Sequence, residues 1–182
     1  MINVETEKNA FERAEKLLAG IPGGIEKATS RALNRALQEG RTAGTREATR
    51  RYTVKAKDVR PTFKMHKASG SNLEAELSSN GRSLPLSAFA HKPNSDTTGA
   101  RRKQVRVGVK KGGLKPLGQG FIWQGRVMQR LGKSSYPIEQ KYGLAVPVIL
   151  NNEEIVDKVV ETMGEAVDKR LEHETQRILD GY

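Results

Sequence analysis

Hydrophobic residues near both ends of the chain recur at the spacing of one helix face, and this pattern predicts three helices. The first covers residues 4–19 and stops at residues 20–24, a turn with one proline and three glycines. The second runs from about Ile25 to Tyr52. Its apolar stripe is made mostly of small residues, so we expect it to lie tightly on a sheet or a partner helix. That stripe is Ile25, Ala28, Ala32, Leu33, Ala36, Leu37, Gly40, Ala43, Gly44 and Ala48.

The third predicted helix spans residues 152–180 and is clearly amphipathic. Asn151 or Asn152 stands where a cap is expected, and acidic residues fill the first turn. Its apolar stripe is Ile155, Val159, Met163, Val167, Leu171 and Ile178.

Between the second and third helices the period becomes that of strands. FKMHKA and LEAELSS alternate apolar and polar residues, and Gly70-Ser71-Asn72 can turn one into the other. Residues 83–89 are expected as an edge strand or loop, and strands are expected at 105–111, 121–131 and 136–140. The order predicts an α+β fold: two N-terminal helices, an antiparallel sheet of about four to six strands, and a C-terminal amphipathic helix packed on the sheet.

Length and composition narrow the possibilities. The 182 residues suit a single domain, 1–182, within which residues 90–120 are expected to form a flexible basic loop region. The absence of cysteine excludes disulfides, thiolate metal sites and cysteine nucleophiles. No apolar run is long enough to span a membrane, and the charged N-terminus does not resemble a signal peptide. We therefore expect a protein that is made in the cytoplasm and has no membrane partner.

Charge is unevenly distributed along the chain. The formal net charge is +11, and it divides into −1 for residues 1–30, +8 for 31–70, +9 for 71–150 and −5 for 151–182. A basic middle with an acidic last helix suits nearby nucleic acid, or head-to-tail packing of identical subunits. Composition does not separate the two. The arginines on the outer face of the second helix are expected to form an ordinary solvated face.

Gly132-Lys133-Ser134 matches the last three residues of the nucleotide-binding P-loop pattern. The pattern requires a glycine five residues before Gly132, and Val127 stands there instead. A P-loop must also open a helix, whereas Pro137 follows in an extended segment. A strand, a tight turn and a second strand describe this stretch better.

Other catalytic or metal-binding patterns are missing. His66, His91 and His173 are scattered without metal-ligand spacing, and no serine lies in a nucleophile elbow. The carboxylates gather on the last helix, where their spacing predicts a solvated stripe. We expect neither a cofactor nor an enzymatic activity.

Nucleic-acid binding is a more specific alternative than catalysis or metal binding. Five basic residues beside flexible glycines could neutralise phosphates: Arg101, Arg102, Lys103, Lys110 and Lys111. Trp123, Phe121, Phe89 and Phe63 occupy positions more consistent with a sheet core than with base stacking. Without a zinc finger, an RNP motif or a basic zipper, only contact that is not sequence-specific is expected.

The run GFIWQGRVMQRLGKSSYPIEQKYGLAVPVILNN resembles the minor tail protein Z family of tailed bacteriophages, and more loosely the phage tail-completion and head–tail joining proteins. The residues that carry the likeness are Arg130, Gly132, Tyr136, Pro137, Gly143 and Pro147. Earlier, the small-residue helix runs into a segment similar to the family's Y-x-(V/I)-K-x-x-D-(V/I). Tyr52, Val54, Lys55, Asp58 and Val59 stand at its positions.

The resemblance implies a structural virion protein of the tail or neck, assembled in the host cytoplasm. It implies a ring of identical subunits, with a hexamer expected, that completes the tail tube, joins tail to head and permits DNA passage. The implied partners are the tail tube or terminator, the neck or connector proteins, and genomic DNA in the channel. In this setting Arg101, Arg102, Lys103, Lys110 and Lys111 would contact DNA or an acidic neighbour. The alternative is a free nucleic-acid-binding protein without sequence specificity.

Overall fold

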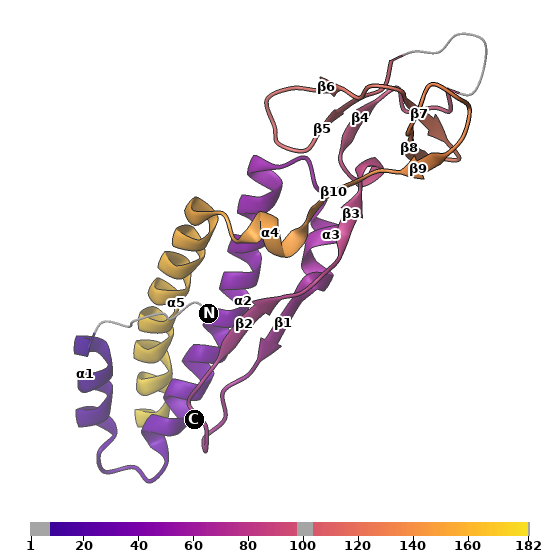
Figure 1. The fold of residues 1–182 in the computed structure, drawn as a ribbon. Coiled ribbons are helices and arrows are strands. Elements are labelled where there is room, and N and C mark those ends of the chain that lie inside the picture. Colours follow the sequence, from indigo (N-terminus) through magenta and orange to yellow (C-terminus); the bar gives the residue numbers. More distant parts are fainter. Residues whose placement is uncertain (1–7, 98–103, 182) are drawn as a thin grey trace. The chain divides into compact units, whose positions relative to one another are not determined.

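The computed structural model describes residues 8–97 and 104–181, and the predicted α+β class is confirmed (Figure 1). The chain divides into two compact units. Unit 1 comprises residues 1–45, 63–79 and 151–182, and unit 2 comprises residues 46–62 and 80–150. Every strand pairing in the described residues is antiparallel, but the strands are shared among small sheets of two or three rather than one sheet.

Three helices and one hairpin build unit 1. The helices are α1 (Lys8–Leu18), the larger part of α2 (Gly24–Arg51) and α5 (Glu153–Leu179). The hairpin joins β1 (Phe63–His66) to β2 (Glu76–Ser79), with His66 opposite Glu76. All three predicted helices and this hairpin are therefore present, and the bounds that can be compared agree within a few residues; the expected start of the first helix, at residues 4–7, lies outside the described residues.

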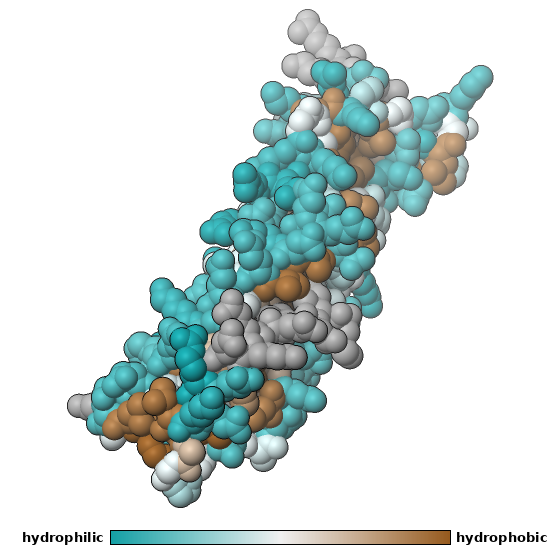
Figure 2. Space-filling model, turned by 90° about the vertical axis from the view of Figure 1, so that its left-hand side faces the viewer, coloured by the Kyte–Doolittle hydropathy of each residue, from teal (hydrophilic) through white to brown (hydrophobic). Residues whose placement is uncertain are grey.

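The stripes of small and apolar residues form the core of unit 1. Ala28, Ala32, Ala36 and Leu37 on α2 are buried, and so is every fourth residue of α5 from Ile155 to Leu171. Gly40 packs closely against both α5 and β2: a Cβ added there would lie 2.5 Å from Sδ of Met163 on α5 and 3.1 Å from Cδ2 of Leu77 on β2. α5 also packs along α1 (Figure 1). Hydrophobic side chains reach the surface at the end of unit 1 that carries α1 (Figure 2), where Phe11 and Leu17 are exposed.

One carboxylate of α5 is completely buried. Glu174 accepts a hydrogen bond from Nη1 of Arg31 on α2 at 3.0 Å, and Arg170 and Arg177 lie 2.6 and 3.6 Å from its oxygens. Burial by itself would raise the pKa of Glu174. The bond from Arg31 and the charges of the three arginines outweigh burial and lower that pKa from its ordinary value of 4.5. The expected solvated stripe therefore does not include Glu174, which ties α5 to α2.

Unit 2 is built from short elements. Its helical turns are α3 (Ala56–Val59), η1 (Arg60–Thr62), η2 (Leu86–Ala88) and α4 (Val146–Leu150). One sheet pairs β3 (Ser83–Pro85) with β10 (Tyr142–Ala145), and a second has the order β4 (Ala90–Lys92), β5 (Arg106–Gly108), β6 (Lys115–Pro116). The third has the order β7 (Gly120–Trp123), β8 (Arg126–Arg130), β9 (Ile138–Gln140).

Residues 121–131 are not the single strand that the pattern predicts. They form the β7–β8 hairpin, which turns at Gln124 and Gly125 with φ of 49° and 70°. Both carboxylate oxygens of Asp96 accept the N–H groups of this turn, at 3.1 and 3.2 Å. The hairpin brings Phe121 opposite Met128 in the core and leaves Trp123 40% exposed, so the expectation of a buried Trp123 is wrong.

The segment from Tyr52 to Val59 anchors unit 2. Tyr52, Val54 and Val59 are buried, and the carbonyl of Lys55 accepts the N–H of Asp58 at 2.9 Å as α3 begins. These positions of the predicted family segment therefore serve the fold.

Candidate functional site

Positive charge is concentrated in unit 2. This unit contains 19 lysines and arginines against 4 aspartates and glutamates, a formal net charge of +15. Unit 1 contains 13 against 17, a net charge of −4, and the two values add to the +11 of the chain. A surface that attracts polyanions or acidic proteins is therefore to be found on unit 2.

Lys110 and Lys111, two of the five basic residues singled out from the sequence, lie beside the C-terminal end of α2. Lys110 forms an isolated β-bridge with Tyr52, and its ammonium lies 5.9 Å from the centre of the Tyr52 ring. The N–H of Lys111 donates to the carbonyl of Arg51 at 2.9 Å. Arg101, Arg102 and Lys103 lie outside the described residues.

The same end of α2 carries one buried carboxylate among three arginines. Nitrogens of Arg46, Arg50 and Arg51 each lie 3.8 Å from a carboxylate oxygen of Glu47. These contacts set one negative charge beside three positive ones, and Lys110 and Lys111 bring two more positive charges to this end of the helix. We call this group the α2-end cluster: Arg46, Arg50, Arg51, Lys110 and Lys111.

A second basic feature lies on the β4–β5–β6 sheet. Lys92 and Arg106 are directly opposite each other on neighbouring strands, and both are exposed. Like charges placed directly across a ladder destabilise it. Within the part of the chain that the structure describes, no carboxylate pairs with either residue. Repulsion between Lys92 and Arg106 therefore lowers the stability of the free chain, and an anionic partner would relieve it.

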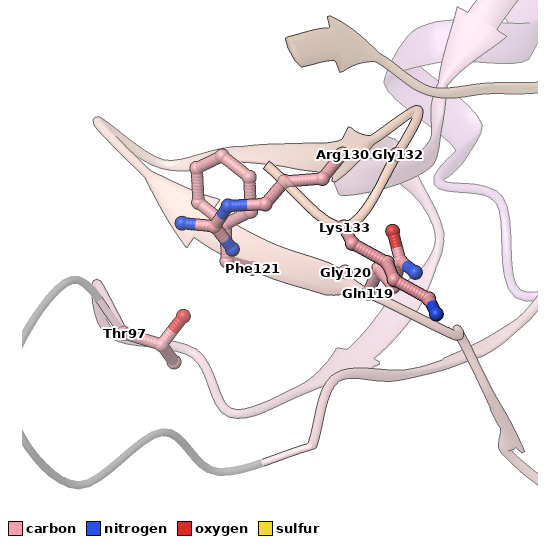
Figure 3. Close-up of a pocket in the computed structure, with 7 residues that line it drawn as sticks. All are labelled: Thr97, Gln119, Gly120, Phe121, Arg130, Gly132 and Lys133. Atoms are coloured by element: carbon pink, nitrogen blue, oxygen red, sulfur yellow. The ribbon is translucent and has the colours of Figure 1, made fainter. Parts of the chain in front are cut away.

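A cavity of about 340 Å³ lies at the open end of the β7–β8 hairpin (Figure 3). Among the described residues, two cations and no carboxylate line it: these residues are Thr97, Gln119, Gly120, Phe121, Arg130, Gly132 and Lys133. The guanidinium carbon of Arg130 lies 4.5 Å from the centre of the Phe121 ring, and Lys133 and Gln119 both line the cavity. Gly132 and Lys133, which resembled part of a P-loop, thus sit in a loop after a strand, and no helix follows them.

Hydrogen bonds hold the wall of this cavity. The N–H of Arg130 donates to the carbonyl of Gln119 at 3.3 Å. With its amide nitrogen turned toward the loop, the Gln119 side chain donates to the carbonyls of Arg130 and Gly132, at 3.0 and 2.7 Å. The side-chain nitrogen of Gln129 donates to the carbonyl of Gly118 at 2.7 Å. The backbone that carries Arg130 and Gly132 is therefore fixed on both sides.

The remaining residues of the predicted family signature have different surroundings. A Cβ on Gly143 would lie 2.7 Å from Cε2 of Phe89, so a larger residue does not fit there. Pro147 is the second residue of α4, in the first turn, where proline is tolerated. Tyr136 precedes a cis bond to Pro137, and its side chain is 74% exposed. Gly143 therefore serves packing, whereas Tyr136 is available to a partner.

The histidines do not assemble into a site. His66 and His173 are exposed, and Nδ1 of His91 lies 2.9 Å from the carbonyl of Phe89. Across residues 8–97 and 104–181, no group of three or more histidines and acids could hold a metal ion. No helix in these ranges is long and apolar enough to cross a membrane.

Sequence reasoning missed the cavity, the exposed Trp123 and the cluster around Glu47. The Gln-Gly pair between two short apolar runs was the available signal for the hairpin. Nothing in the sequence indicated the cavity, because its residues come from separate segments.

Comparison with known proteins gives one relation. The family model described as prophage minor tail protein Z (GPZ) matches residues 8–181, nearly the whole chain. No curated protein and no solved structure has a significant match to it.

Proposed function

This chain belongs to the prophage minor tail protein Z family and is a structural protein of a phage tail, and from that premise we propose that it forms a ring that completes the head-proximal end of the tail tube. The ring, with six copies expected, joins the tail to the neck or connector and leaves a channel for DNA. Its contacts are other copies of the chain, the tail tube or terminator protein, and the neck. The proposed role is structural rather than enzymatic.

The division of charge between the units carries this proposal. A surface that binds DNA phosphates is cationic, and unit 2, at +15, can supply one. The α2-end cluster and the Lys92–Arg106 pair are candidates for that surface, because each brings positive charges close together. Unit 1, at −4, offers the opposite charge for a head-to-tail contact between copies.

The test uses a phage whose own gene for this protein is deleted and is supplied in trans. Averaged images of tails made with the wild-type protein should show a closed ring at the head-proximal end. Charge reversal at Lys110 and Lys111 should leave tails intact but lower the yield of DNA-filled, infective particles by about tenfold or more. The matched control reverses Lys64 and Lys67, which are exposed lysines of unit 1. Normal DNA retention and infectivity in the Lys110/Lys111 variant would reject the DNA-facing role, and tails without a ring would reject the whole proposal.

One observation favours the second candidate, a free nucleic-acid-binding protein. Trp123 is 40% exposed and lies directly across from Arg126, which together offer an aromatic platform beside a cation. Such a protein should shift non-specific DNA in a gel as an isolated monomer, with binding that weakens steeply as salt rises. A ring component should instead form an ordered assembly only in the presence of tail or neck partners.

A further inference from the structure

The cavity beside Arg130 has side chains whose charge and geometry suit a carboxylate. The Arg130 guanidinium is held against the Phe121 ring, and the backbone beneath it is fixed by Gln119. A guanidinium held in this way presents a planar fork that matches the two oxygens of a carboxylate. Lys133 adds a second charge on the loop side, and no acid among the described lining residues would neutralise the pair.

Apolar side chains flank the cavity loop. Leu131 is 60% exposed and Tyr136 is 74% exposed, and the N–H of Leu131 donates to the carbonyl of Pro137 at 3.1 Å. Exposed aromatic and aliphatic side chains beside a held arginine are typical of protein interfaces. DNA phosphates would gain little from such neighbours. The surroundings therefore favour an acidic protein segment over a nucleic acid.

An acidic row on α5 has the matching chemistry. Glu153, Asp157, Glu161 and Glu165 follow one another at a spacing of four residues, and all are exposed. Like charges at this spacing destabilise a helix. Glu161 pairs with Lys158 at 2.6 Å, whereas Glu153, Asp157 and Glu165 have no ion pair among the described residues. Their charge is thus available to a cation from another molecule.

We propose that the Arg130–Lys133 cavity of one copy receives carboxylates of the acidic row on α5 of the next copy. This contact rests on the proposed ring and specifies which surfaces meet in it. Because the two surfaces differ, each copy can use both, which is the head-to-tail arrangement that closes a ring.

The test makes use of the cysteine-free sequence. Lys133→Cys is combined in turn with Glu153→Cys, Asp157→Cys or Glu165→Cys, and each full-length double variant is assembled into tails and mildly oxidised. At least one pairing should give a ladder of disulfide-linked multimers in denaturing gels, because a disulfide forms only where the Cα atoms come within about 7 Å. Each single variant should give no ladder. The matched control pairs Lys115→Cys, an exposed lysine of β6 outside the cavity, with the same row positions and should also give none.

A second measurement does not depend on cysteine geometry. Arg130→Gln with Lys133→Gln should lower incorporation into tails by about 30-fold or more, while Lys115→Gln with Lys57→Gln, two exposed lysines of unit 2, should leave it unchanged. Circular dichroism and Trp123 fluorescence verify that each variant is folded. If a ring is visible but no row position cross-links and the neutral variant incorporates normally, the cavity contact is rejected and the ring stands. If images show no ring, the proposed function itself fails. A neutral variant that incorporates normally but loses DNA retention would assign the cavity to DNA and overturn the proposal.

Discussion

Replacement of Glu174 by glutamine should destabilise unit 1 more than any exposed change on α5. The carboxylate is fully buried and faces three guanidiniums, at 3.0 Å from Arg31, 2.6 Å from Arg170 and 3.6 Å from Arg177. Glutamine keeps the shape but supplies no charge. The three arginines then repel one another around a neutral amide.

The size of this loss of stability depends on how well the arginines that remain can be hydrated. Removing one partner of a buried pair costs about 3–5 kcal/mol when the remaining charge is also buried. Here the remaining charges belong to Arg31, Arg170 and Arg177, whose side chains are 39%, 36% and 44% exposed and can be hydrated. The glutamine oxygen can still accept a hydrogen bond from Arg31. We therefore expect a loss of about 2 kcal/mol in the free energy of unfolding, or about 4–8 °C in the melting temperature.

The pH dependence gives the same prediction a second test. Because the folded pKa of Glu174 lies below its ordinary value of 4.5, its stabilisation is complete above that pH and is lost as the pH falls through the folded pKa. The difference between wild type and Glu174→Gln should therefore be largest near neutral pH and shrink below about pH 4.5.

Urea unfolding followed by circular dichroism at 222 nm is the assay, because α1, α5 and most of α2 belong to unit 1. Trp123, the single tryptophan, lies in unit 2 and reports separately. Glu165→Gln is the matched control, an exposed acid on the same helix, and should change stability by less than about 0.5 kcal/mol. A Glu174→Gln variant as stable as this control, or a difference that does not change with pH, would refute the reasoning.

Three further predictions concern unit 2. Gly143→Ala should destabilise unit 2 by about 1–3 kcal/mol in Trp123-detected unfolding, because the new Cβ meets the buried Phe89 ring at 2.7 Å. Adding Phe89→Leu should recover part of this loss. A Gly143→Ala variant of normal stability would contradict the prediction. Lys92→Glu should stabilise the chain by about 0.5–1 kcal/mol, because it sets an opposite charge across from Arg106; a destabilised variant would show that the pair does not repel. Raising the salt concentration from about 0.02 to 0.3 M should raise the urea midpoint detected by Trp123, since the net charge of +15 on unit 2 is then screened. A falling midpoint would show that attractive ion pairs outweigh the repulsion.

The helices were predictable because their apolar stripes are long. Over 27 residues of α5 the period of a helix is repeated often enough to exclude a strand, and the buried residues follow the expected stripe as far as Leu171. The strands of unit 2 contain two to five residues each, so their pattern carries little information. The β7–β8 hairpin was missed for a further reason. Its turn needs positive φ at Gln124, a residue that seldom signals such a turn.

The candidate site was predictable only in part. Lys110 and Lys111 were found because basic residues beside glycines indicate an exposed surface. Their position at the end of α2 depends on the bridge to Tyr52, a pairing 58 residues away along the chain that no local pattern records. Helical spacing alone predicts a solvated Glu174. It carries no information about Arg31, which lies 143 residues earlier and donates the hydrogen bond that allows the Glu174 carboxylate to be buried.

The two surfaces assigned to partners share a physical property that the fold does not explain. The Lys92–Arg106 pair repels across a ladder, and the acidic row of α5 repels along a helix, so each lowers the stability of the free chain. The buried carboxylates behave differently: Glu47 and Glu174 are each surrounded by arginines, which shows that this chain places opposite charges together where the fold needs them. At the two surfaces proposed to meet partners, an opposite charge from DNA or from another copy would relieve the repulsion. In the proposed ring, a cost in the free chain that assembly removes would favour the assembled ring over the separate subunit.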